Sequence, residues 1–285
     1  MHTNTTKMHL LAGAAGRLRG LPVVWHMRVL LTQPGARAWL RRAVRLVRPH
    51  VIAISTAVAA QFEGMRCPLH VVPNGIPLER FEPGPPPPHL GAELGLPAGA
   101  PTVCVVGRLT PWKGHQVLLR GWPDVLARVP DARLLVVGEV AFWEDGYGDE
   151  LRALASELGI AASVHWLGFR EDVADLLRLS DLLVLPSIDE PFGRVVIEAM
   201  AAARPVVATA SGGIPEIVVD GDTGLLVPPR EPEPLADAIA ALLADPARAR
   251  AMGQAGRRRA LELFDVRRVA AQVQAIYDGI LSGHG

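Results

Sequence analysis

Two basic side chains, Arg108 and Lys113, follow an expected strand within VGRLTPWKG, residues 106–114. Gly107 allows a tight exit from the strand, and Lys113 falls where the next helix should begin. Two cations beside a helix N-terminus suit the charge of a diphosphate. The segment is neither a G-x-G-x-x-G turn nor a Walker A loop, so an ordinary turn with surface cations fits the spacing equally well.

Two carboxylates, Glu190 and Glu198, are separated by seven intervening residues in PSIDEPFGRVVIEAMA, residues 186–201. The glycine at 193 should open a helix whose first N–H groups, from Gly193 to Val195, can accept an anion. A carboxylate can hold a pair of vicinal hydroxyls. The segment therefore suits a sugar nucleotide, although a loop charge at Glu190 and an arginine partner for Glu198 would also explain it.

Alternating strands and helices position these residues. Strands are expected at 102–107, 132–138, 163–168, 181–187, 204–210 and 223–229, with helices at 114–128, 148–158, 171–179, 193–203, 213–219, 232–244, 246–263 and 265–282. This order predicts an α/β fold with a doubly wound parallel sheet, whose ligand should lie outside the carboxyl ends of the strands.

A shorter α/β repeat comes first. Its strands are expected at 21–27, 50–55 and 69–75, and its helices at 5–19, 35–48 and 56–64. Because it begins inside the pattern, we expect an incomplete Rossmann-like domain. The stretch EPGPPPPHLGAELGLPAGAP, residues 82–101, is too rich in Pro and Gly for a helix or central strand and predicts a linker.

Composition limits the remaining classes. Apolar residues make up 49% of 285, which excludes a mainly disordered chain. Cys67 and Cys104 are too few for a disulfide framework or a four-cysteine zinc site, so we expect a reducing, cytoplasmic location. There is no run of 18 apolar residues. Residues 1–80 carry eleven Lys/Arg and two Glu in a chain of zero net charge, which suggests two regions with different partners.

The segments GRLTPWKG, LLVVGE, VHWLGF and SDLLVLPSIDEPFGRVVIEAMAAARPVVATASGGIPEIVVDGDTGLLVPP together resemble the retaining glycosyltransferases of family four. The resemblance covers residues 69 to about 280. It implies a GT-B fold of two Rossmann-like domains and a metal-independent hexosyltransferase-type enzyme without a cofactor. The donor would be a UDP- or GDP-linked sugar, and the acceptor a saccharide, a lipid-linked sugar or a small molecule.

The resemblance also implies roles for single residues. Arg108 and Lys113 would hold the donor diphosphate, Glu198 the ribose, and Glu190 the donor sugar. Backbone N–H groups of Phe192, Gly193, Arg194 and Val195 would face sugar and phosphates, and Gly168 and Phe169 would flank the base. His26, after its strand, would lie near the donor sugar, although a structural histidine is an equal alternative. Asn4 and Lys7 could face the same cleft, and Asn74-Gly75 would mark the crossing between domains.

The same likeness divides the chain. Residues 1–81 would form part of an acceptor-side domain, 82–101 the linker, 102–264 the donor domain, and 265–285 a helix packing back on the first domain. Because the first domain looks incomplete, a chain that binds the nucleotide sugar without turnover is the alternative to an enzyme. A sugar-nucleotide epimerase is disfavoured by the two glutamates, and nucleic-acid binding lacks any motif.

Two further patterns have a functional and an ordinary interpretation. Arg37, Arg41, Arg45 and Arg48 share one face of the expected helix 35–48, which suits an anionic membrane at its inner face or simply solvent. The D-x-D of Asp220-Gly221-Asp222 could suggest a metal, but D-G and T-G predict turns there.

Overall fold

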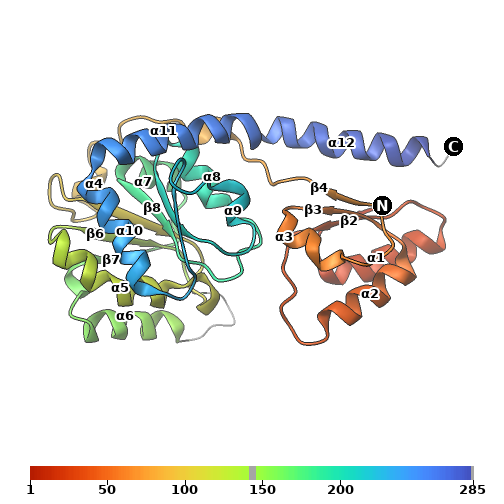
Figure 1. Cartoon of the computed structure of the whole chain (residues 1–285), viewed down its shortest axis with the longest axis horizontal. Helices are drawn as coiled ribbons and strands as arrows, with labels where there is room; N and C mark the ends of the chain where they lie inside the picture. Colours follow the sequence, from red (N-terminus) through yellow and green to blue (C-terminus); the bar gives the residue numbers. More distant parts are fainter. Residues whose placement is uncertain (141–145, 284–285) are drawn as a thin grey trace.

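The computed structural model describes residues 1–140 and 146–283. They form two lobes, each built on one sheet (Figure 1). The first sheet has the strand order β1-β2-β3-β4 and the second the order β10-β9-β8-β5-β6-β7, and the pairs are parallel. Parallel neighbours need crossover connections, which helices supply. The predicted α/β class with two Rossmann-like sheets is confirmed.

The first lobe is the smaller one. Its strands are β1 (His2–Thr3), β2 (Val24–Met27), β3 (His50–Ala53) and β4 (Leu69–Val71), and its helices are α1 (Thr6–Leu18), α2 (Ala36–Val47) and α3 (Thr56–Ala59). Helical spacing decides which face of α2 is buried. Leu40, Val44 and Val47 pack into the core with Trp25 of β2, while the arginines between them remain exposed.

The second lobe contains the longer sheet. Its strands are β5 (Thr102–Val106), β6 (Arg133–Val137), β7 (Val164–Gly168), β8 (Leu182–Leu185), β9 (Val206–Thr209) and β10 (Leu225–Val227). The chain runs outward from β5 to β7, returns to the middle, and runs the other way from β8 to β10. β5 and β8 are therefore neighbours at the point of reversal, where ligands of doubly wound sheets bind.

Helices cover both faces of this sheet. They are α4 (Leu90–Glu93), α5 (His115–Arg128), α6 (Tyr147–Glu157), α7 (Val173–Leu179), α8 (Arg194–Ala201), α9 (Ile214–Ile217), α10 (Pro232–Ala244) and α11 (Pro246–Leu263). Helices α5, α6 and α10 bury one face, on which Val103 and Val184 lie. The other face, with Leu183 and Val206, packs against α8. The alternating residues of each strand thus belong to two separate cores.

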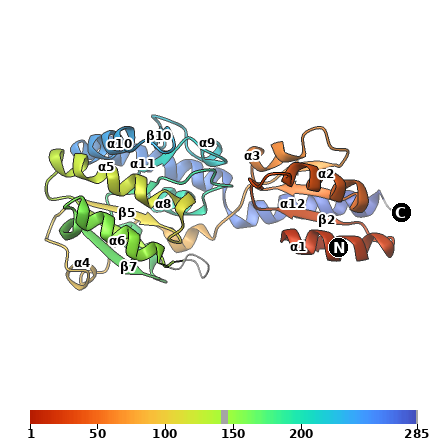
Figure 2. The ribbon, with the colours of Figure 1, turned by 90° about the horizontal axis from the view of Figure 1, so that it is seen from below.

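A last helix, α12 (Val266–Ser282), joins the two lobes. It follows α11 along one side of the molecule and lies over the first sheet (Figures 1 and 2). Val24, Ile52 and Val72 form a small core with Ile280 of α12. The first sheet is therefore covered by α12 on one face and by α1 and α2 on the other.

The structure corrects three expectations about these elements. A fourth strand, β1, precedes the three predicted in the first lobe and pairs with β2. The Pro/Gly-rich stretch 82–101 contains one helical turn, α4, because Leu90 is buried against the second lobe. The helix expected at 213–219 covers only Ile214–Ile217.

Candidate functional site

A pocket of about 600 Å³ lies between the lobes, at the carboxyl ends of β5 and β8. We call it the cleft pocket. Nine predicted site residues line it: Gly107, Arg108, Lys113, Glu190, Phe192, Gly193, Arg194, Val195 and Glu198. They come from the segments that follow β5 and β8. Lys113 and Glu190, one from each segment, are 77 positions apart in the sequence, but β5 and β8 are neighbours in the sheet. The topology therefore brings together the two motifs that the sequence singled out.

Lys113 and Glu190 form an ion pair on the floor of this pocket. Lys113 Nζ donates to Glu190 Oε2 at 2.7 Å, and the two side chains are only 15% and 9% exposed. Lys113 Nζ also lies 4.4 Å from the ring centre of Trp112. An ammonium has three N–H donors. Lys113 can therefore hold Glu190 and still offer hydrogen bonds to a bound anion.

The start of α8 gives the pocket a second set of donors. Gly193 is the N-cap with φ of 98°, and as a glycine it has no side chain with which to cap the helix. The first N–H groups of a helix have no acceptor within it. A side chain at 193 would also meet Ile214, since an added Cβ would lie 2.4 Å from Ile214 Cδ1. Glycine here lets the helix present its N-terminus to the cleft.

Glu198 occupies the second turn of α8. Its side chain is 16% exposed and its Oε1 lies 4.0 Å from Arg194 Nη2. Burial raises the pKa of Glu198, and the charges of Arg194 and Arg80 oppose that rise. The arginine partner that the sequence allowed is thus present, but it is exposed at the pocket rim and leaves the carboxylate available to a ligand.

A second hollow continues the cleft pocket over β5 and β6. Gly107 and Arg108 line both, and Phe169 and Glu139 line the second hollow alone. Phe169 is 66% exposed, and the predicted Gly168 precedes it at the end of β7. Phe169 lines the second hollow and Gly168 does not, and a role of either residue beside a base stays a prediction. Glu139 has no counterpart in the sequence prediction.

His26 does not line the cleft pocket. Its side chain is buried, its ring centre lies 5.4 Å from that of His2, and its Nδ1 lies 3.3 Å from Arg28 Nη2. Burial, reinforced by the charge of Arg28, lowers the pKa of His26 to about 3. This packing favours the structural alternative for His26, and the first lobe presents Arg28 to the pocket instead.

The first lobe contributes four pocket residues that the site prediction did not include, namely Arg28, Val29, Ile54 and Asn74. Arg28 Nη1 donates to Asn74 Oδ1 at 2.5 Å, and its Nε lies 3.4 Å from Asn4 Oδ1. Arg28 comes directly after β2. The rule that carboxyl ends of parallel strands share one edge would have identified it. Lys7 is exposed on α1 and does not belong to the pocket lining.

The D-x-D segment forms a turn. Asp220 Oδ1 accepts a hydrogen bond from Leu226 N, and Gly221 N donates to Gly224 O at 2.9 Å. Within residues 1–140 and 146–283, no group of three or more His, Cys, Asp or Glu side chains could hold a metal ion. The interpretation of this segment as a turn is confirmed.

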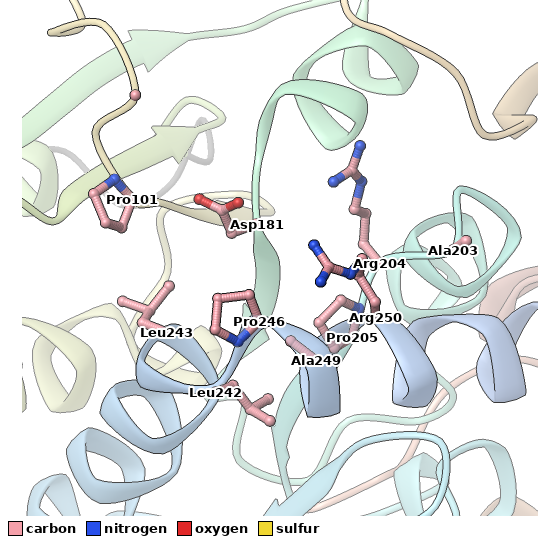
Figure 3. Close-up of a pocket in the computed structure, with 11 residues that line it drawn as sticks. Pro101, Asp181, Ala203, Arg204, Pro205, Leu242, Leu243, Pro246, Ala249 and Arg250 are labelled. Atoms are coloured by element: carbon pink, nitrogen blue, oxygen red, sulfur yellow. The ribbon is translucent and has the colours of Figure 1, made fainter.

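A separate pocket lies at the opposite, amino edge of the second sheet (Figure 3). Asp181, Arg204 and Pro246 are among its lining residues, and its volume is about 340 Å³. The Asp181 carboxylate already has a partner within the protein, since its Oδ2 accepts a hydrogen bond from Thr102 N at 2.7 Å. None of the predicted site residues lines this pocket.

Comparisons with known proteins match both lobes. Residues 90–259 fit the family model described as glycosyl transferases group 1, and residues 1–80 fit the model of glycosyltransferase family 4. No helix in the described part of the chain is long and apolar enough to cross a membrane.

Individual relatives point the same way. A D-inositol 3-phosphate glycosyltransferase of Corynebacterium jeikeium is 38% identical over 201 residues, which are 68% of this chain and 48% of that protein. One of Streptomyces avermitilis is 36% identical over 230 residues, 78% of this chain and 49% of that protein. The chain thus spans less than half the length of these relatives.

A solved structure shares most of this chain's fold. Anabaena HepE in complex with UDP-glucose superposes with a TM-score of 0.88 at 32% identity, over 98% of this chain and 78% of that one. HepE has also been solved in complex with UDP and glucose.

Proposed function

The chain belongs to the glycosyl transferases group 1 family, and from this premise we propose that it binds a nucleotide diphosphate sugar in the cleft pocket and transfers the sugar to an acceptor. The observation that carries the proposal is the meeting of Arg108, Lys113 and the glycine-capped start of α8 around one pocket. In this proposal residues 102–264 form the donor domain, and residues 1–81 contribute the acceptor side of the cleft.

The charges at the pocket suit departure of a diphosphate. When the bond between the sugar and the diphosphate breaks, negative charge develops on the leaving oxygen. Arg108, Lys113 and the N–H groups from Gly193 onward would stabilise that charge without rearrangement. These residues supply the positive charge that a metal ion would otherwise provide, so we propose a metal-independent reaction.

The remaining site residues would orient the donor. We propose that Glu198 accepts hydrogen bonds from the ribose hydroxyls and Glu190 from the sugar, while the base lies along the second hollow beside Phe169. The fold and sequence likeness to HepE, solved with UDP-glucose, favours a UDP-linked donor. Retention of the anomeric configuration is part of the proposal through the family resemblance.

The acceptor proposal is coarser. The relatives are named for D-inositol 3-phosphate, and a HepE complex contains glucose, so we propose a hydroxylated ring, either a saccharide or a cyclic polyol. Incubation of the chain with UDP-glucose and D-inositol 3-phosphate, followed by NMR of the anomeric proton, would reveal both transfer and the configuration of the product.

Binding without turnover is the second candidate, because Arg108, Lys113 and Glu190, which we propose to bind the donor, all belong to the second lobe and do not by themselves identify an acceptor site. Calorimetric titration with UDP, GDP and ADP, without added metal, tests the shared part of both candidates. Micromolar binding of one nucleotide supports the donor site and identifies the base. No binding by a well-folded sample would overturn both candidates, whereas binding without product formation would favour the second.

We also propose peripheral contact of the first lobe with an anionic membrane at its cytoplasmic face. Arg41 and Arg45 are exposed on α2, Arg48 is exposed directly after its end, and Leu46, on the adjoining side of the helix, is 65% exposed. Such a face attracts anionic lipids and can insert an apolar side chain.

Co-sedimentation with vesicles tests the membrane proposal. We expect the chain to bind vesicles that contain phosphatidylglycerol and to dissociate from them at high salt. It should not bind vesicles of pure phosphatidylcholine. The paired variant Arg41→Glu/Arg45→Glu should lose this binding. Arg248→Glu/Arg250→Glu, which changes two exposed arginines of α11, is the matched control. Equal binding by both variants would overturn the proposal.

A further inference from the structure

The chain crosses between the lobes twice, and the two crossings lie against each other. Ile76 N donates to Phe264 O at 3.0 Å, and Val266 N donates to Ile76 O at 3.1 Å. Gly75 is needed for this approach, because an added Cβ would lie 2.7 Å from Val266 Cα. Two adjacent crossings restrict relative motion of the lobes to rotation about one short region, as in a hinge.

Away from these crossings, a carboxylate of the second lobe binds the first lobe directly. Glu216 Oε2 accepts from Thr56 N at 2.8 Å and Glu216 Oε1 accepts from Ala57 N at 3.1 Å. Both N–H groups belong to the first turn of α3, where intrahelical acceptors are absent. A charged acceptor on two such donors makes a strong, directional contact.

The backbone around Glu216 is hydrogen-bonded to α11 of the second lobe. Arg259 of α11 donates through Nε to Ile217 O at 2.7 Å and through Nη2 to Glu216 O at 2.8 Å. The carbonyls at the end of the short α9 are thereby fixed to a long helix. The backbone that carries the Glu216 carboxylate is thus anchored within the second lobe.

The same start of α3 contacts the loop that carries Glu190. Ser55 Oγ donates to Pro191 O at 2.8 Å, and Gly213 N donates to Glu190 O at 2.9 Å. The three segments are tightly packed, since a Cβ at Gly213 would lie 2.6 Å from Pro191 O and 3.0 Å from Ser55 Cβ. Movement of α3 would therefore remove one hydrogen bond from the loop that presents Glu190 to Lys113.

We infer that Glu216 and Ser55 are positioning residues that couple closure of the two lobes to the geometry of the cleft pocket. With the lobes closed, Glu216 binds α3 and Ser55 holds Pro191, which keeps Glu190 beside Lys113. Opening about the crossings at Ile76 breaks these contacts together. The inference rests on the proposed nucleotide site, because a ligand in the cleft pocket must favour the closed arrangement for the coupling to act.

The proposed coupling between lobe closure and nucleotide binding can be measured from either side. We call the two hydrogen bonds from Thr56 N and Ala57 N to the Glu216 carboxylate the clamp. Whatever free energy the clamp adds to nucleotide binding, bound nucleotide must add to the stability of the clamp, because coupling between two sites is reciprocal. Amide hydrogen exchange at Thr56 and Ala57 reports the clamp, and calorimetric titration with UDP reports the pocket. Glu216 itself does not line the cleft pocket, so a direct effect on the ligand is not the cause of any change.

We expect UDP to slow exchange at Thr56 and Ala57 in the natural chain. In Glu216→Ala this slowing should disappear and UDP should bind about 5- to 20-fold more weakly. Glu216→Gln keeps one acceptor oxygen and should lie between the two. Glu262→Ala, an exposed glutamate of α11, is the control and should behave as the natural chain.

The outcomes separate the two proposals. If UDP binds the natural chain and Glu216→Ala with equal affinity, and slows amide exchange at Thr56 and Ala57 equally in both, the coupling through Glu216 is wrong. The proposed nucleotide site would be unaffected by that result. A natural chain that binds none of UDP, GDP and ADP would overturn the proposed function and the coupling with it. Thermal unfolding of each variant, with Glu216→Gln as the gentler change, distinguishes loss of coupling from loss of fold.

Discussion

Lys113 Nζ and Glu190 Oε2 lie 2.7 Å apart on loops after neighbouring strands, and both side chains are mostly buried. Replacing one partner leaves the other charge buried without compensation. We expect Lys113→Met to lower the free energy of unfolding by about 3 kcal/mol. The same variant should weaken UDP binding at least about tenfold, because a charge-assisted hydrogen bond to phosphate is lost.

The double variant Lys113→Met/Glu190→Gln distinguishes these two effects. It removes both charges, so most of the stability measured by chemical denaturation should return. UDP affinity should stay low, because the cation is still absent. Recovery of both stability and affinity in the double variant would exclude a direct role of Lys113 in binding the nucleotide.

Nucleotide affinity should depend on pH through Glu198. Burial raises the pKa of this carboxyl, and only its charged form is a good double acceptor for ribose hydroxyls. Affinity should therefore fall as the pH drops through a pKa above the ordinary glutamate range. In calorimetric titrations Glu198→Gln should bind UDP about tenfold more weakly at pH 7.5 and lose this dependence. A Glu198→Gln variant with the same pH profile as the natural chain would contradict the assignment.

Acid should destabilise the first lobe through His26. Burial lowers the pKa of His26 to about 3 from its ordinary value of 6.5, so the unfolded chain binds the proton more tightly than the folded one. Stability must then decrease as the pH falls from 6.5 towards 3, by on the order of 1–2 kcal/mol between pH 6.5 and 5.

Denaturation curves at several pH values test this. His26→Gln should flatten the slope of unfolding free energy against pH, and the exposed His89→Gln should not. Part of the slope should survive in His26→Gln, because burial also lowers the pKa of His9 and of His115 to about 4. An unchanged slope in His26→Gln would show that this ring is not kept neutral by the fold.

The sequence sufficed for features that depend on local pattern. Apolar runs such as LLVL at β8 predict buried strands. Lys113 and Glu190 could be placed together because residues that follow parallel strands lie at the same edge of the sheet. Arg28 obeys the same rule and could have been predicted. By contrast, β1 has two residues, too few to show any periodicity, and it is fixed by pairing with β2.

The remaining features depend on contacts between distant segments. Leu90 forms a helical turn inside a Pro-rich stretch only because a hollow of the second lobe buries it. The hydrogen bonds from Thr56 and Ala57 to Glu216 join residues about 160 positions apart and depend on how the two lobes meet. Neither relationship leaves a periodic signal in the chain.

The last prediction concerns Gly138, at the carboxyl end of β6. Its φ is +137°, and an added Cβ would lie 2.0 Å from Gly107 O, a backbone atom that cannot rotate away. Gly138→Ala should therefore push apart the loops after β5 and β6 and lower the free energy of unfolding by at least about 3 kcal/mol. Gly221→Ala is the matched control, because Gly221 has φ of +78° but no atom within 4 Å of its added Cβ. It should cost only about 1 kcal/mol, the backbone strain alone. Equal costs in chemical denaturation would mean that strain, and not the close approach to Gly107, fixes glycine at 138.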